Sequence, residues 1–224
     1  MLSHLRDHQE LARLKNSSRL VIAAHPDDET FWGGLALASG EWAAAVLTHR
    51  STKWRKSAFE TAMTIYGARG AIFNLPDKHW GPLNERELAS MRALITKLVC
   101  LPKLTDVLTH SPDGESGHTF HKLISQLVTE YVRPDVRLHY FSFDEDFSAP
   151  RDEPELWRKK RAATDAYLAA TPGVPGNDIL HIRLSEHESP AVACDYIRPA
   201  RLFRSIYSGS TVPNADIPDL STSA

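Results

Sequence analysis

The chain has 224 residues, a formal net charge of −2, 42% hydrophobic residues and 24% charged residues. These values are typical of a soluble globular protein, and the length suits one large α/β domain or at most two small ones. Without a basic excess, nucleic acid and an anionic membrane surface are not expected as partners. No run approaches the roughly 18 to 20 apolar residues of a membrane span.

Cys100 and Cys194 are the only cysteines in the sequence, which is too few for a disulfide framework. A reducing compartment is therefore the simpler expectation, and we expect a cytoplasmic protein. Residues 1–18 are mixed in charge and lack the apolar region of a signal peptide. The sequence gives no indication of an oligomeric state.

Short apolar runs alternate along the chain with segments of helical spacing. In chain order, this pattern predicts a helix within 1–18, a strand at 19–24, a helix at 30–39, a strand at 42–48, a helix at 53–66, a strand at 71–75, a helix at 84–101, a strand at 105–109, a helix at 117–131, a strand at 136–143, a helix at 154–170 and a strand at 179–184.

This alternation is typical of βαβ units and predicts an α/β fold. We expect a Rossmann-like open, mostly parallel sheet with helices on both faces. No internal repeat or interdomain linker interrupts the pattern, so residues 1–208 are predicted to form one domain. Residues 209–224 are rich in Ser, Thr, Pro and Asp and are expected to be a flexible tail.

Polar side chains follow each of the first four predicted strands. The groups are His25, Asp27, Asp28 and Glu29 after the first strand, Thr48, His49 and Arg50 after the second, Asp77 after the third, and His110, Asp113, Glu115, His118 and His121 after the fourth. In open α/β sheets, ligands bind beyond the carboxyl ends of the strands. If the strands are parallel, all four groups share one edge of the sheet.

Each of the two richest groups has an ordinary structural explanation when taken alone. The acids of HPDDE, at 25–29, could cap the next helix and favour its N-terminus through the helix dipole. The histidines of GHTFH, at 117–121, could be solvated on one helix face. Together at one edge of a sheet, the two groups favour a ligand site instead.

Histidine nitrogens and carboxylate oxygens are the ligands of catalytic zinc, which uses about three protein ligands and keeps an open position for water. A spare carboxylate beside such a metal can deprotonate water. A second histidine can stabilise an oxyanion or protonate a leaving group. The residue set therefore predicts metal-assisted hydrolysis, although the sequence alone leaves open which aspartate binds and which acts as base.

Between residues 19 and 125 the sequence resembles the LmbE-like, or PIG-L-type, metal-dependent N-deacetylases. AHPDDE at 24–29, followed by the pair Gly33-Gly34, matches the first motif of that family. LTHSPDGESGHTFH at 108–121 matches the second, a GHxDH-like segment preceded by Thr-His and a Gly-Glu pair. The resemblance implies a Rossmann-like sheet and a zinc-dependent amidase that acts mainly on N-acetylglucosamine conjugates.

Carried over residue by residue, the resemblance implies roles for seven side chains. The metal ligands are His25, Asp28 and His121, the general base is Asp27, the oxyanion-stabilising or acid histidine is His118, and the residues that grip the sugar are Arg55 and Asp77. The implied metal is Zn²⁺, with Fe²⁺, Co²⁺ and Mn²⁺ as alternatives. The implied partner is a small amino sugar or a glycoconjugate.

The sequence departs from the family pattern at two positions. Phe120 stands where an aspartate often precedes the last histidine, which removes a possible ligand-orienting carboxylate. Ala58 stands where an acidic residue often follows the arginine by three positions. Glu29 is expected to orient the turn rather than to bind the metal, and Gly33 and Gly34 are expected to give backbone room near the site.

The sequence therefore predicts a hydrolase that removes an N-acetyl group from an N-acetylglucosamine-type sugar or its conjugate. Three alternatives stay open. The chain could be a metal-dependent amidase or esterase for another acyl substrate, or a catalytically silent relative that binds a glycan. It could also be a non-catalytic Rossmann-like module for a sugar or nucleotide, although no G-x-G-x-x-G follows the first predicted strand.

Overall fold

The computed structural model describes residues 2–77, 83–141, 154–170 and 198–199. Its helices are α1 (Leu2–Leu14), α2 (Asp28–Ala38), α3 (Lys53–Tyr66), α4 (Glu85–Val99), α5 (Gly114–Gly117), α6 (Thr119–Tyr131) and α7 (Pro154–Ala170). Its strands are β1 (Arg19–Ala23), β2 (Ala43–Thr48), β3 (Gly70–Leu75), β4 (Asp106–Thr109), β5 (Arg137–Tyr140) and β6 (Arg198–Pro199).

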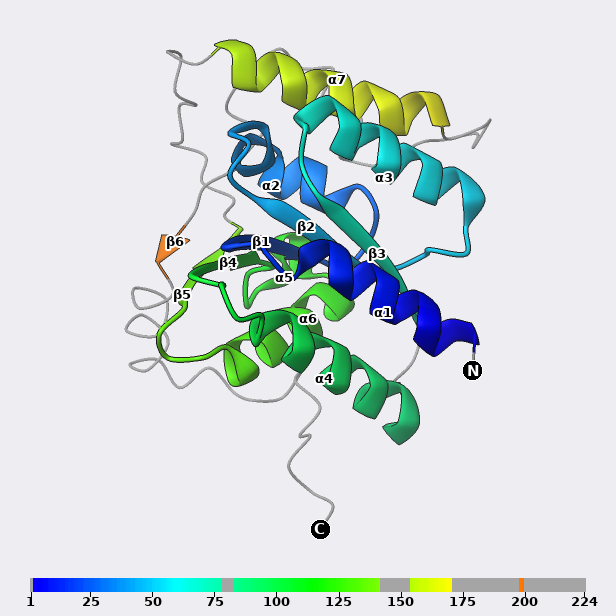
Figure 1. The fold of residues 1–224 in the computed structure, drawn as a ribbon, viewed down its shortest axis with the longest axis vertical. Coiled ribbons are helices and arrows are strands. Elements are labelled where there is room, and N and C mark those ends of the chain that lie inside the picture. Colours follow the sequence, from blue (N-terminus) through cyan, green and yellow to red (C-terminus); the bar gives the residue numbers. More distant parts are fainter. Residues whose placement is uncertain (1, 78–82, 142–153, 171–197, 200–224) are drawn as a thin grey trace.

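The strands form one sheet in the order β3-β2-β1-β4-β5-β6 (Figure 1). Neighbours from β3 to β5 pair in parallel, and the short β6 pairs antiparallel with β5. The expected open, mostly parallel α/β sheet is confirmed. The chain runs from β1 to β2 on one side and returns to β4 on the other, so the strand order reverses next to β1. Such a reversal leaves a crevice at the carboxyl ends of β1 and β4.

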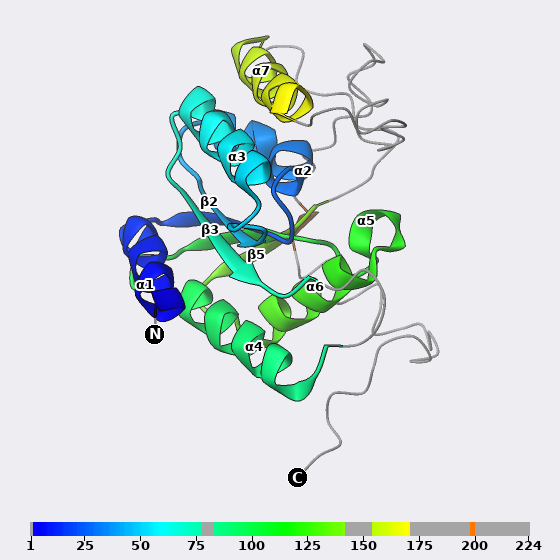
Figure 2. The same cartoon turned by 90° about the vertical axis from the view of Figure 1, so that its right-hand side faces the viewer.

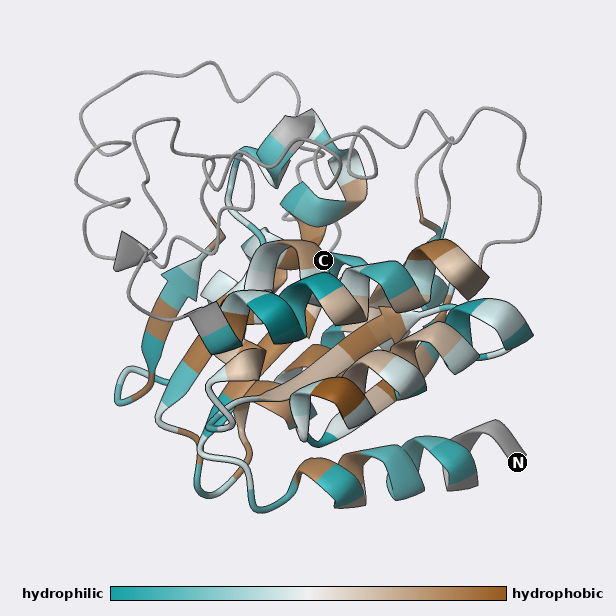
Figure 3. Cartoon of the chain, turned by 90° about the horizontal axis from the view of Figure 1, so that it is seen from above, coloured by the Kyte–Doolittle hydropathy of each residue, from teal (hydrophilic) through white to brown (hydrophobic). Residues whose placement is uncertain are grey.

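Two apolar cores cover the two faces of the sheet. On one face, α1, α4 and α6 pack against buried side chains such as Leu20 and Ile22 of β1. On the other face, α2 and α3 pack against Val21 and Ala23, and α7 lies across the outer side of α2 and α3 (Figures 1 and 2). Figure 3 shows the consequence, with hydrophobic strands inside and hydrophilic residues on the outward sides of the helices.

Local signals fix several helix ends where the sequence predicts them. The Asn84 side chain accepts a hydrogen bond from the Glu87 backbone N–H, and the Glu87 carboxylate accepts one from the Asn84 N–H, each at 2.9 Å. This capping box starts α4. Gly67 ends α3 in the left-handed conformation, at φ 68°, which a residue without Cβ adopts at little cost.

The predicted helix at 117–131 is wrong in one respect, because the chain forms two helices there. His118 has extended backbone, with φ −63° and ψ 117°, and it separates α5 from α6 as the N-cap residue of α6. The predicted strand at 179–184 and the predicted tail at 209–224 lie outside the described residues, as do residues 142–143 of the predicted strand at 136–143. None of the described helices has the length and apolar character needed to cross a membrane.

The pair Gly33-Gly34 serves packing rather than space at the site. A Cβ at Gly33 would lie 3.1 Å from Val21 Cγ1 of β1, and one at Gly34 would lie 2.7 Å from the Tyr66 hydroxyl of α3 and 3.0 Å from Lys160 Cγ of α7. The glycines therefore let α2 approach the sheet and its neighbouring helices closely. The expectation that Gly33 and Gly34 give backbone room near the site is therefore wrong.

Candidate functional site

Three of the predicted site residues converge at the carboxyl ends of β1 and β4. His25 follows β1, Asp28 begins α2, and His121 lies in the first turn of α6. The His25 Nδ1–Asp28 Oδ2 distance is 3.1 Å, His121 Nε2–Asp28 Oδ2 is 3.2 Å, and His121 Nε2–His25 Nδ1 is 3.3 Å. All three residues are buried. The three donor atoms thus form a nearly equilateral triangle.

The size of this triangle fits a tetrahedral metal. Ligand atoms bound to zinc at about 2.0–2.1 Å and at tetrahedral angles are separated from one another by about 3.3 Å. Two imidazole nitrogens and one carboxylate oxygen at this spacing leave a fourth tetrahedral position free of these side chains. The residues present therefore fit a catalytic divalent metal ion, and they are one of the groups of His and Asp whose ligand atoms lie within 4.8 Å of one another.

Each of the two histidines turns its other ring nitrogen to a buried carboxylate. Glu115 Oε2 lies 2.7 Å from His121 Nδ1, and Asp77 Oδ2 lies 3.3 Å from His25 Nε2. The side chains of the two acids are 1% and 6% exposed. Metal-binding histidines typically make this kind of contact, which fixes the orientation of the ring and raises its basicity.

Two more histidines complete this carboxylate network. His110 lies at the end of β4; it accepts a hydrogen bond from the Ala24 backbone N–H at Nε2, 2.9 Å away, so its proton is on Nδ1 and points to Glu115 Oε2 at 2.9 Å. His49, after β2, places Nε2 at 3.1 Å from Asp77 Oδ2. The groups His110–Glu115–His121 and His25–His49–Asp77 also have metal-like spacing, but both include one histidine of the triangle.

Asp27 lies beside the triangle and does not cap α2. It occupies the N-cap position, yet its side chain accepts no capping hydrogen bond, and its φ of 129° is strained for a residue with a Cβ. The Asp28 carboxylate also turns back to the His25 backbone N–H, at 2.9 Å, rather than to the helix. Helix capping therefore does not account for either aspartate.

Glu29 holds the turn, as the sequence predicts. Its carboxylate accepts hydrogen bonds from the Asp27 backbone N–H at 3.0 Å, the Thr30 hydroxyl at 2.8 Å and the Tyr167 hydroxyl of α7 at 2.7 Å. Glu29 is fully buried, and none of these three hydrogen bonds involves a residue of the donor triangle. A helix more than 130 positions further along the chain thus fixes the backbone of Asp27.

The pKa values around the site diverge because of burial and of the charges nearby. Burial and the adjacent Asp28 raise the pKa of Asp27 to about 7, against the opposing charge of Arg55. Burial raises the pKa of Asp28, but the charge of His121 and the hydrogen bonds from both histidines hold it well below its ordinary value. Burial lowers the pKa of both histidines, but Asp28 and Asp77 raise the pKa of His25 to about 9, and Asp28 and Glu115 raise that of His121 to about 10.

His118 lies over the triangle from the turn between α5 and α6. Its ring stacks on that of His121 with centroids 4.3 Å apart, and meets the His25 ring edge-on at 5.3 Å. Burial and the charges of His121 and His25 lower its pKa to about 4. His118 is therefore neutral at pH 7 and retains one ring N–H as a hydrogen-bond donor.

The two predicted sugar-binding residues have different surroundings. Arg55, in the first turn of α3, has its guanidinium carbon 5.0 Å from the Trp54 ring centroid and acts on Asp27 through its charge. Asp77 is already bonded to His25 and His49, which favours a positioning role. Contact of either residue with a substrate stays a prediction.

Sequence reasoning placed His49, His110 and Glu115 at the correct edge of the sheet but gave them no role. A signal for Glu115 was present, since the Gly-Glu pair belongs to the second motif. The sequence suggested that Phe120, in place of an aspartate, leaves the site without a ligand-orienting carboxylate. In the structure Glu115 supplies that carboxylate to His121. Glu115 and His49 also have positive φ, at 56° and 63°, so three of the site's non-glycine residues have strained backbone.

Comparison by sequence gives limited information. No family model matches the chain. Among curated proteins, the chain is 27% identical over 143 residues to the uncharacterized protein L374 of Acanthamoeba polyphaga mimivirus. The match takes in 56% of this chain and 62% of that protein, so the chain spans less than two thirds of the curated relative that it matches.

Comparison with solved structures confirms the fold. The N,N'-diacetylchitobiose deacetylase of Pyrococcus horikoshii matches with a TM-score of 0.56 over 90% of this chain and 91% of its own, at 12% identity. A deacetylase of the teicoplanin biosynthesis pathway matches with a TM-score of 0.51 over 75% and 90%, at 15% identity. GalB, the 4-carboxy-2-hydroxymuconate hydratase of Pseudomonas putida KT2440, matches with a TM-score of 0.50 over 87% and 91%, at 18% identity.

The chain thus has the fold that its resemblance to the LmbE-like, or PIG-L-type, deacetylases implies. The neighbours include a hydratase beside the deacetylases, so one fold carries more than one reaction. The fold alone therefore does not determine the reaction of this chain.

Proposed function

We propose that this protein is a member of the LmbE-like family and a metal-dependent hydrolase that removes the N-acetyl group from an N-acetylglucosamine-type amino sugar or its conjugate. The observation that carries the proposal is the triangle of His25, Asp28 and His121 with Asp27 beside it, whose carboxylate makes no helix-capping hydrogen bond. The deacetylase folds and the pair of motifs at 24–29 and 108–121 support the same reaction.

In this proposal His25, Asp28 and His121 hold Zn²⁺ or another divalent ion such as Fe²⁺, Co²⁺ or Mn²⁺. When bound, the ion would lower the pKa of a water molecule and polarise the carbonyl of the amide. Asp77 and Glu115 keep the two imidazoles turned toward the ion. Glu115 can do so as an acceptor at neutral pH, because its hydrogen bonds with His110 and His121 lower its pKa to about 2 against the effect of burial.

Asp27 acts as the general base. A pKa of about 7 is suited to this role, since the carboxylate can take a proton from water and release it again near neutral pH. The hydrogen bond from the Asp27 backbone N–H to Glu29 holds the strained backbone in place. After the C–N bond breaks, protonated Asp27 gives its proton to the leaving amine, and acetate is the second product.

His118 stabilises the negative charge that develops on the amide oxygen. A neutral imidazole can donate its N–H to that oxygen, and the lowered pKa of His118 keeps it neutral at pH 7. Arg55 is proposed to contact the sugar from the start of α3. Asp77 is proposed to act on the substrate through His25 and His49, while direct contact with the sugar stays a prediction.

The test is release of a free amine from a panel of N-acetylglucosamine conjugates, measured with and without a chelator. We expect metal-dependent release of the amine and stoichiometric metal in the purified protein. The His121→Ala variant should lose both the amine release and the bound metal. The Lys97→Gln variant is the control, because Lys97 is an exposed residue of α4 on the far side of the molecule from α2.

Other outcomes would select among the alternatives. Metal content without amine release from any conjugate, together with hydrolysis of another amide or an ester, would point to a different acyl substrate. Metal content without any hydrolysis would indicate a silent glycan-binding relative. A protein that purifies without metal and binds nucleotides would contradict the proposal and support a Rossmann-like binding module.

A further inference from the structure

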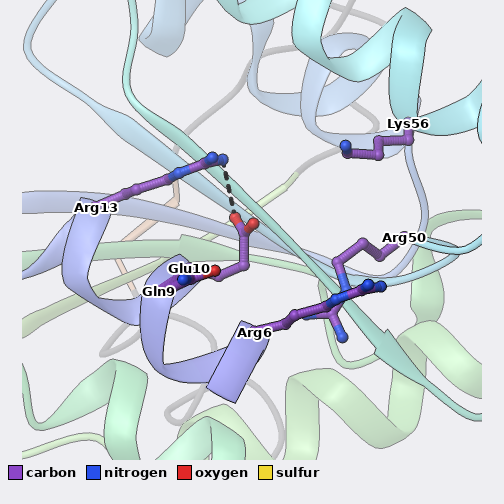
Figure 4. Close-up of a pocket in the computed structure, with 6 residues that line it drawn as sticks. All are labelled: Arg6, Gln9, Glu10, Arg13, Arg50 and Lys56. Carbon is purple, nitrogen blue, oxygen red and sulfur yellow. Dashed lines mark hydrogen bonds and ion pairs between the residues drawn. The ribbon is translucent and has the colours of Figure 1, made fainter. Parts of the chain in front are cut away.

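A pocket of about 360 Å³ lies outside the candidate site, between α1 and the chain that leads from β2 into α3 (Figure 4). Its lining residues are Arg6, Gln9, Glu10, Arg13, Arg50 and Lys56. Figure 4 shows Arg6 and Arg13 extending from α1, and Arg50 and Lys56 reaching in from the chain that follows β2 and from α3. Side chains from two segments that are distant in sequence, 6–13 and 50–56, thus meet at one concave surface.

The lining is strongly cationic, although the whole chain has a formal net charge of −2. Glu10, the one acid that lines the pocket, is buried and turned to the protein, since its Oε2 accepts hydrogen bonds from Arg13 at 3.1 Å and from the Ile72 backbone N–H at 3.3 Å. Glu10 therefore holds Arg13 in place and closes the floor of the pocket against β3.

The other cations are only partly compensated. Arg50 pairs with Asp7 at 2.6 Å. Lys56 pairs with Glu60 at 3.4 Å, and the side chains of Lys56 and Glu60 are both more than 40% exposed. An ion pair that is open to water contributes little and is readily exchanged. Arg6 has no ion pair among the residues that the structure describes. Cations outnumber the acids even when Asp7 and Glu60 are counted.

We infer that this pocket is a binding site for a phosphate-type dianion. Arginine presents a planar fork of donors that matches phosphate oxygens, and lysine adds a compact charge. Arg6 and Lys56 are available for such contacts, and Arg50 is held at the pocket by Asp7. A cavity of this volume also accommodates a phosphoryl group together with part of the molecule that carries it.

The pocket adjoins the candidate site through two pairs of consecutive residues. His49 contacts Asp77 of the site, whereas the next residue, Arg50, lines the pocket. Arg55 acts on Asp27 by its charge, whereas the next residue, Lys56, lines the pocket. An anion in the pocket would therefore contact the same segment, between β2 and α3, that borders the site.

The test is binding of inorganic phosphate to the full-length protein by isothermal titration calorimetry. EDTA is present, so that phosphate on a metal ion in the site does not contribute. We expect saturable single-site binding that weakens as salt is added. The double variant Arg6→Gln, Lys56→Gln should bind at least about tenfold more weakly, because each lost contact is a charge-assisted hydrogen bond.

The matched control is Lys97→Gln, Lys103→Gln, which removes the same charge from exposed positions that do not line the pocket. Equal weakening in both double variants, or no saturable binding in the wild type, would overturn the inference. Circular dichroism of both variants establishes that they are folded. Because the chelator is present throughout, a failure here leaves the proposed hydrolase reaction untouched.

The source of the anion is distinguished by comparing three probes. If the phosphoryl group belongs to a substrate, N-acetylglucosamine 1-phosphate should bind more tightly than both inorganic phosphate and N-acetylglucosamine, and the advantage should vanish in the Arg6→Gln, Lys56→Gln variant. If the ligand is free phosphate, the sugar should add nothing to the affinity. Either result supports the pocket as an anion site, and the two results assign it to different ligands.

Discussion

Glu115 Oε2 lies 2.7 Å from His121 Nδ1 and 2.9 Å from His110 Nδ1, so one buried carboxylate orients two histidines. The Glu115 side chain is 1% exposed and the backbone at Glu115 has a positive φ of 56°. A strained backbone is retained only where the surrounding contacts compensate for it. The bonded pair of imidazoles provides those contacts and turns His121 Nε2 toward Asp28.

Replacing Glu115 by Gln should weaken metal binding by about 10- to 100-fold, as is typical when the carboxylate behind a metal-binding histidine is lost. The amide keeps the size of the side chain but loses its negative charge, and its NH₂ group cannot accept the hydrogen bond that Glu115 Oε1 accepts from the Ser111 backbone N–H at 2.8 Å. Metal affinity is measured by competition with a chromogenic chelator. Glu130→Gln, at an exposed position of α6, the helix that carries His121, is the control. Unchanged affinity in Glu115→Gln would contradict the orienting role.

Replacing Asp27 by Asn should lower kcat by about 10²- to 10⁴-fold, the range expected for loss of a general base. Metal content should not change, because Asp27 is not one of the three donors of the triangle. Asp28→Asn should behave differently and lose metal as well as activity. Amine release and metal analysis of both variants test the division of roles. Near-normal turnover of metal-loaded Asp27→Asn would show that another group is the base.

Replacing Tyr167 by Phe should lower kcat by roughly 3- to 10-fold, since the hydroxyl of α7 anchors the Glu29 carboxylate that holds Asp27, and one such hydrogen bond contributes about 0.5–1.5 kcal/mol. KM and metal content should change little. Tyr140→Phe is the matched control, because its hydroxyl also makes a side-chain hydrogen bond, partly buried, to Thr129 at 2.6 Å. An equal loss of kcat in both variants would indicate general destabilisation.

The free energy of unfolding should depend on pH through Asp106, at the amino end of β4. Hydrogen bonds with Arg137 and His139 outweigh the effect of burial and lower its pKa from 3.8 to about 2. The proton therefore binds more tightly to the unfolded chain. The stabilisation of the folded state by the Asp106 carboxylate should be complete above about pH 5 and amount to about 2 kcal/mol, and it should be lost as the pH falls through about 2.

Urea unfolding of wild type and Asp106→Asn across this pH range measures the effect. The unfolding free energies of the two proteins, plotted against pH, should differ most near neutral pH and converge at low pH. Asp135→Asn is the control, since Asp135 pairs with Arg133 but its side chain is 70% exposed, and it should change the unfolding free energy little at any pH. A constant difference between wild type and Asp106→Asn would contradict the assignment.

Much of the fold follows from local patterns in the sequence. The continuous apolar runs at 19–24 and 42–48 predicted buried parallel strands, because only a strand covered on both faces has no polar side. The helix at 53–66 was predicted with the bounds that the structure shows. Parallel strands bring their carboxyl ends to one edge, and this topological rule placed His25, Asp28 and His121 at the same edge, while the resemblance to a known family singled them out as a set.

Only the tertiary structure decided which carboxylate contacts and orients which histidine. Asp77 and His25 lie 52 positions apart, Tyr167 and Glu29 are separated by 138, and neither contact leaves a periodic pattern in a short window of sequence. The break at His118 and the positive φ values of Asp27, His49 and Glu115 likewise depend on packing that overrides local preference. The sequence by itself determined the sheet and the residues at its edge, because strand burial and helix amphipathicity are local. The orientation of those residues, and the cationic pocket that α1 forms with the start of α3, were decided by contacts between distant segments.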